Sequence, residues 1–129
     1  MKIEHLTNTN SAHPKDSILR IFDFDLSEAC RFRDMLSRLA DGSATTIDLD
    51  RISFVEAIAD CHLVLKVGTK SKGVIILSKS TFECILTRDA WEDAKDLIEP
   101  FCEGNLSGYQ WLYNLNTNVE LLFSPSGDW

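Results

Sequence analysis

A chain of 129 residues with 44% hydrophobic and 26% charged residues has the composition of one soluble globular domain, which excludes extensive disorder. Its net charge of −7 argues against nucleic acid and anionic membrane surfaces, because both are recognised through Lys and Arg. No apolar stretch is long enough to cross a bilayer, and the N-terminal residues do not resemble a signal peptide. We therefore expect a cytoplasmic protein whose charge is compatible with a basic protein partner.

Residues 1–16 are predicted to form a polar, flexible lead-in to a single α+β domain over 17–129. The segment TNTNSAHPKD has little hydrophobic periodicity and contains several residues that favour loops. Residues 1–6 alternatively pair as an edge strand. Partial alternation of apolar residues over 17–24 then predicts the first secure strand.

A helix is predicted to begin at Asp25, which stands three residues before Glu28 in the arrangement of a capping box. Apolar residues then recur at helical spacing and form one stripe: Ala29, Phe32, Leu36, Leu39 and Ala40. Gly42 is well placed to end this helix in the left-handed conformation.

The middle of the chain, over 61–87, is predicted to form three short strands in a meander that buries much of the core. A short strand over 45–49 precedes it, and 51–60 is interpreted as a connector. Residues 74–77 are apolar on both faces of the expected strand, which is typical of an interior position in a sheet.

A second helix is predicted to open at Thr87 or Arg88. Its expected buried stripe consists of Trp91, Ala94, Leu97 and Ile98. Pro100 lacks the N–H that a helix interior needs, so the helix should stop or kink near Glu99. The last elements are a hairpin over 109–114 and 119–123.

This order of elements predicts an α+β fold. We expect a largely antiparallel or mixed sheet with two amphipathic helices packed on one of its faces.

The outer side of the second helix is predicted to be acidic. Its carboxylates are Asp89, Glu92, Asp93, Asp96 and Glu99. Such a face of one sign steers a basic partner, as in small acidic inhibitor or immunity proteins. The alternative is a solvated helix face that only keeps the protein in solution.

An aromatic row near the C-terminus allows two interpretations. Its members are Tyr109, Trp111 and Tyr113, with Trp129 close by in sequence. If exposed, the row forms a stacking platform or an association surface, for which a homodimer fits the overall charge better than nucleic acid. If buried, the row is part of the core.

The case for an enzyme depends on Cys61 and His62. Successive strand residues point to opposite faces, so these two side chains cannot form a dyad with each other. The neighbouring turn carries a candidate anion patch, made of Lys66, Lys70, Lys72 and Lys79. Its alternative role is to keep a sheet end in solution and to discourage aggregation.

The cysteines at positions 30, 61, 84 and 102 form no CxxC pair, so they are expected to be reduced thiols. No residue pattern predicts a catalytic group, a metal site or a cofactor. The sequence therefore favours a small acidic, non-enzymatic protein-interaction module of regulatory, inhibitor or immunity type. The alternative is a small enzyme or anion-binding protein with a site near Cys61, His62 and the Lys-rich turn 66–79.

Overall fold

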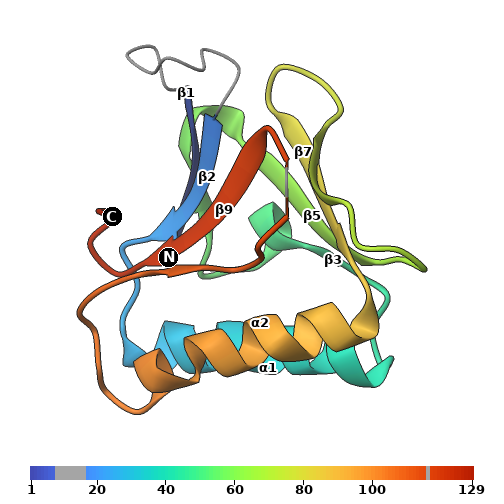
Figure 1. Ribbon diagram of the computed structural model, residues 1–129. Coiled ribbons are helices and arrows are strands. Elements are labelled where there is room, and N and C mark those ends of the chain that lie inside the picture. The colour runs from blue at the N-terminus through green and yellow to red at the C-terminus, as the bar shows by residue number, and fades with distance from the viewer. Residues whose placement is uncertain (8–16, 116) are drawn as a thin grey trace.

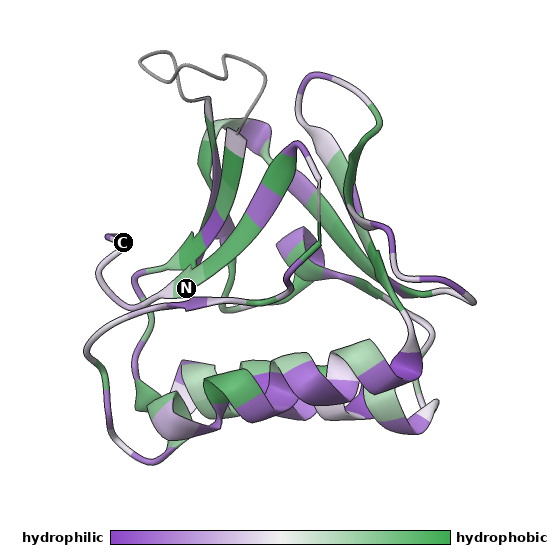
Figure 2. Cartoon of the chain, in the orientation of Figure 1, coloured by the Kyte–Doolittle hydropathy of each residue, from purple (hydrophilic) through white to green (hydrophobic). Residues whose placement is uncertain are grey.

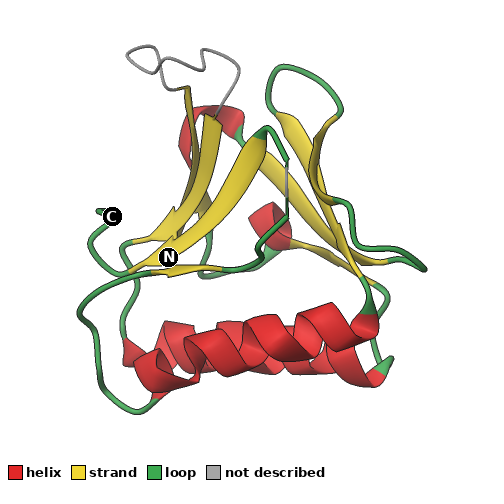
Figure 3. Ribbon diagram, viewed as in Figure 1, coloured by secondary structure: helices red, strands yellow, loops and turns green. Residues whose placement is uncertain are grey.

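Two helices form one layer of the protein, and two β-sheets that meet at an angle form the other (Figures 1 and 3). The computed structural model describes residues 1–7, 17–115 and 117–129. The predicted α+β class is confirmed, with two helices covering one side of the strands. The strands divide between two mixed sheets instead of forming one.

The first helix, α1 (Leu26–Asp41), follows its local sequence signals closely. Asp25 caps its N-terminus by accepting from the Glu28 N–H at 2.8 Å, and the Glu28 side chain accepts from the Asp25 N–H in return. Gly42 ends the helix at a φ of 83°, a conformation that favours glycine. The stripe from Ala29 to Leu39 is buried, while Ala40 is partly buried.

The second helix, α2 (Arg88–Cys102), lies beside α1 and is capped by Thr87. Two expectations for it were wrong. Leu97 is 36% exposed, and Phe101 takes its place among the buried residues of the helix. The helix also continues past Glu99 and includes Pro100 in its last turn before it ends at Cys102. Pro100 has no N–H to donate, so it removes one backbone hydrogen bond near the end of the helix.

The first sheet has the strand order β4-β1-β2-β9-β8. Its strands are β1 (Lys2–Thr7), β2 (Ser17–Phe22), β4 (Glu56–Ala57), β8 (Gln110–Trp111) and β9 (Val119–Ser124). The alternative of an N-terminal strand is confirmed, because β1 is antiparallel to β2, and residues 1–7 belong to the domain. Its expected position at an edge is wrong, because β1 also pairs in parallel with the short strand β4 on its other side. The remainder of the predicted lead-in, 8–16, lies outside the described residues. β2 runs parallel to β9, and β8 pairs with β9 as the end of the predicted hairpin.

The second sheet has the strand order β3-β5-β7-β6. Its strands are β3 (Thr46–Asp48), β5 (His62–Val67), β6 (Gly73–Ile76) and β7 (Thr81–Leu86). The predicted meander is wrong, because β5 pairs with β7 in parallel and β6 lies on the far side of β7. Short 3₁₀ turns at Leu49–Arg51 and Ile58–Asp60 connect this sheet to its neighbours.

Strand β6 is an edge strand and not the interior strand that its composition suggests. Val74 is buried, but Ile76 and the following Leu77 are 52% and 55% exposed. The central position goes to β7, whose residues Phe82, Cys84 and Leu86 are fully buried. Apolar composition therefore identified β6 as a strand but gave the wrong position for it.

The core lies between the helices and the strands, where hydrophobic residues concentrate on the strands (Figure 2). Phe123 of β9 stacks on Phe24 and on Phe32 of α1, with ring centroids 4.2 and 5.2 Å apart. Phe101 of α2 meets the same ring edge-on at 5.2 Å. This aromatic cluster joins both helices to the middle of the first sheet.

Tyr113 connects the two sheets. Its hydroxyl accepts a hydrogen bond from the Val74 N–H of β6 at 3.0 Å and donates one to the Val119 carbonyl of β9. Gly73 makes the approach close, since a Cβ there would lie 2.9 Å from the Tyr113 ring. The segment between β8 and β9 is thereby held against both sheets. Neither described helix is long and apolar enough to cross a membrane.

Candidate functional site

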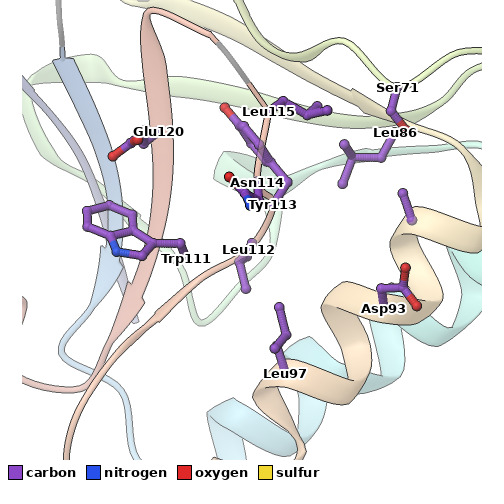
Figure 4. Close-up of a pocket in the computed structure, with 11 residues that line it drawn as sticks. Ser71, Leu86, Asp93, Leu97, Trp111, Leu112, Tyr113, Asn114, Leu115 and Glu120 are labelled. Carbon is purple, nitrogen blue, oxygen red and sulfur yellow. The ribbon is translucent and has the colours of Figure 1, made fainter.

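A cavity with a volume of about 610 Å³ lies between α2 and the 111–115 segment (Figure 4). Leu97 on α2 and Leu112 and Leu115 across from it make apolar walls. Asp93 from α2 and Glu120 from β9 add a carboxylate on each side. The cavity is therefore mainly apolar, with acidic groups at its margins.

A second cavity of about 240 Å³ shares Trp111 and Glu120 with the first. Ser17 and Ile18 at the start of β2 contribute to its wall, and Trp129 closes it. We call these two adjoining cavities together the Trp111 groove. It runs from the side of α2 to the outer face of the first sheet.

The aromatic row divides between the two interpretations given by the sequence. Trp111 lies edge-on to Tyr109 and to Trp129, with ring centroids 6.0 and 6.5 Å apart, and Trp129 is 54% exposed. Tyr113 belongs instead to the connection between the sheets, and burial raises the pKa of its hydroxyl to about 12. Three of the four aromatic side chains therefore form one surface cluster.

The acidic face of α2 is largely exposed, but its members have different environments. Asp89, Glu92, Asp93 and Asp96 are exposed, and Figure 2 shows hydrophilic residues along this side of the helix. Glu92 pairs with Lys95 at 2.8 Å, and the partly buried Glu99 pairs with Arg33 of α1 at 3.1 Å.

Asp93 differs from these neighbours because it lines the Trp111 groove. Among the described residues, neither Asp93 nor Glu120 forms an ion pair. Glu120 was not identified from the sequence. Its signal was a single charged residue inside the apolar run of β9, which marks the outward side of that strand.

The four lysines of the candidate anion patch do not form one site. Lys66 is paired with Glu83 at 3.1 Å across β5 and β7. Lys70 and Lys72 lie before β6, whereas Lys79 follows it at the other end of the strand.

Cys61 and His62 point to opposite faces, as the alternation along β5 predicted. Cys61 is buried, and burial raises the pKa of its thiol to about 11. His62 is exposed and its Nδ1 lies 2.7 Å from Oδ2 of Asp50. Within the described ranges, no three His, Cys, Asp or Glu side chains gather as metal ligands would.

His5 belongs to the N-terminal strand and not to a flexible lead-in. It lies in β1, where its ring packs on Phe82 with centroids 4.7 Å apart. A cavity of about 350 Å³ beside it is lined by Cys61 and Lys79 among others. Burial lowers the pKa of His5, which favours its neutral form.

Comparison with protein-family models, with curated proteins and with solved structures finds no match for this chain. The chemistry of the Trp111 groove therefore has to be inferred from its own residues. Apolar walls, indole rings and carboxylates that form no ion pair among the described residues suit a ligand that carries both a positive charge and apolar surface.

Proposed function

We propose that this protein is a small acidic, non-enzymatic interaction module of regulatory, inhibitor or immunity type. The Trp111 groove receives a basic segment of a partner protein. The observation that carries the proposal is the presence of Asp93 and Glu120, without ion pairs among the described residues, at the margins of the mainly apolar 610 Å³ cavity.

The composition of the groove suits a Lys or Arg side chain better than an acidic or purely apolar one. The aliphatic stem of such a side chain can lie along Leu97 and Leu115 while its charged end reaches a carboxylate. Burying that stem contributes free energy in proportion to the apolar area removed from water. An acidic ligand would instead meet carboxylates of the same sign.

The wider charge distribution supports the same kind of partner. The net charge is −7, and the exposed carboxylates of α2 lie beside the groove on the same helix as Asp93. A field of one sign raises the rate at which an oppositely charged partner meets its site. We also propose a cytoplasmic location, because the four cysteines are free and thiols stay reduced in that compartment.

A synthetic peptide library that combines Lys or Arg with Leu would test the proposal, measured by fluorescence anisotropy at two ionic strengths. A charge-reversed library with Glu at the same positions serves as the reference. We expect the basic peptides to bind, and to bind more weakly at higher ionic strength. Binding of both libraries alike, or of neither, would contradict the proposal.

Two variants with the same change of charge separate the groove from the general field. Asp93→Lys places a cation at the groove, while Asp96→Lys changes the same helix at a residue that pairs with Lys95 at 3.6 Å instead. We expect Asp93→Lys to weaken binding by about tenfold or more and Asp96→Lys by much less. Equal losses would mean that the acidic field acts without the groove.

A further inference from the structure

We propose that the smaller cavity of the Trp111 groove is a cation–π site for a methylated ammonium group, such as that of a methylated lysine side chain. This inference rests on the proposed function and specifies the chemistry of the basic group that the partner presents. Its elements are two indole rings and one carboxylate.

The two indole rings form a corner. The Trp111 and Trp129 planes are inclined at 65° with centroids 6.5 Å apart, and both rings line the cavity. A cation placed in such a corner can lie within about 6 Å of both centroids, the range over which the ring faces attract positive charge. Each ring therefore provides a wall for the same ammonium group.

A carboxylate in the cavity favours a charged ligand over an apolar one. Glu120 lines this cavity as well as the larger one, so its carboxylate can neutralise an ammonium held between the rings. An uncharged apolar ligand would desolvate this carboxylate without providing a partner, which is unfavourable.

The tail that carries Trp129 is held in place before any ligand arrives. The Ser124 hydroxyl donates to the Asp128 carbonyl at 2.8 Å, and Arg20 donates to the Gly127 carbonyl at 3.2 Å. Gly127 has a φ of 84°, and a Cβ there would lie 2.7 Å from the Arg20 guanidinium. Rigid aromatic walls reduce the entropy that binding would otherwise cost.

Arg20, whose guanidinium donates to this tail, is already paired within the protein. Its Nε donates to the Glu4 carboxylate at 2.9 Å, and its guanidinium lies 4.0 Å from the centroid of the Phe22 ring. The carboxylate that neutralises Arg20 is therefore Glu4, and Glu120 is left for a ligand. A methylated ammonium group is hydrated more weakly than an unmethylated one. It therefore loses less hydration free energy when it enters the space between the two indole rings.

The site can be tested on the intact protein with choline and its neutral isostere 3,3-dimethylbutan-1-ol. Indole N–H signals in NMR spectra would report binding, with Trp91 as an internal reference because its buried indole donates to the Lys66 carbonyl at 2.9 Å. We expect choline to shift the Trp111 and Trp129 signals and the isostere to bind about tenfold more weakly. Equal affinity for the two molecules would overturn the site.

Matched variants assign the effect to the cavity. Trp129→Ala and Glu120→Gln should each weaken choline binding severalfold, while Trp129→Phe should retain part of it. Glu103→Gln removes the same charge from an exposed position outside both cavities and should leave choline binding unchanged. Unchanged affinity in both Trp129→Ala and Glu120→Gln would contradict the inference.

Peptides with lysine or trimethyllysine at one position distinguish this inference from the proposed function. Tighter binding of the methylated peptide than of choline supports a protein side chain as the ligand. Choline binding without any peptide binding would keep the cation–π site and reject the protein partner. Equal binding of the lysine and trimethyllysine peptides, together with no binding of choline, would reject the cation–π site and keep the proposed function.

Discussion

The Cys61–His62 region and the aromatic row that contributes Trp111 and Trp129 to the Trp111 groove were both candidate sites in the sequence, and the structure gives them opposite environments. Charged groups in the first have internal partners: His62 faces Asp50 at 2.7 Å, and Lys66 faces Glu83 at 3.1 Å. In the groove, Glu120 has no such partner among the described residues, and Trp129 is 54% exposed.

The difference shows why residue types alone do not identify a site. A charge that is satisfied within the protein has little interaction free energy left for a ligand, and a buried thiol with a raised pKa is a weak nucleophile. Cys61 and Cys84 are of this kind, since burial raises the pKa of both thiols. Exposed rings beside an unpaired carboxylate retain that capacity.

The largest expected effect separates the core side of α2 from its groove side. Ile98→Ala removes a fully buried side chain and should lower the free energy of unfolding by about 2–5 kcal/mol. Leu97→Ala should cost less than about 1.5 kcal/mol, because Leu97 is already 36% exposed. Urea unfolding measures both variants, and binding of the basic peptides should decrease in Leu97→Ala. Equal destabilisation would contradict this assignment of the two sides.

Tyr113→Phe tests the connection that holds the groove wall against both sheets. The variant leaves the Val74 N–H without this partner, while the Val119 carbonyl keeps its hydrogen bond from the Thr117 hydroxyl at 2.7 Å, and it should cost about 1–3 kcal/mol. The absorbance of the unmodified protein should also show one tyrosine that ionises only near pH 12, because burial raises the pKa of Tyr113. Loss of this late ionisation in Tyr113→Phe assigns it. An unfolding free energy equal to that of the parent would contradict the connection.

The smallest effect concerns Asp50 in the first region. Partial burial alone would raise its pKa, but hydrogen bonds from His62 and from the Leu63 N–H outweigh burial and hold the pKa below its ordinary value. A lowered carboxylate pKa contributes stability above the ordinary value, and this stability is lost as the pH falls through the folded value. Asp50→Asn should therefore cost up to about 1 kcal/mol near neutral pH, since His62 is half-exposed.

The pH dependence of that difference is the measurement that checks it. The gap in unfolding free energy between the parent and Asp50→Asn should shrink as the pH falls below about pH 4. Glu83→Gln provides a comparison at the other internal pair of the same sheet. A gap that grows as the pH falls would show that Asp50 is not stabilised by its partners.

Local chemistry in the sequence determined the helices of this protein. The capping box of Asp25 and Glu28 and the left-handed Gly42 depend on residues within one or two turns, so their effect is readable from neighbours in the chain. The alternation along β5 likewise gave the opposite orientations of Cys61 and His62. These features follow from backbone geometry over a few residues.

Tertiary structure decided which strands pair and which polar groups stay free. Strand β6 looked interior from its composition, yet pairing of β5 with β7 left it at an edge. Trp111 and Trp129 meet only because β8 pairs with β9 and the C-terminal tail folds back onto the same face. Strand order and the neighbours of Glu120 depend on contacts between distant parts of the chain, and a local hydrophobic pattern does not specify those contacts.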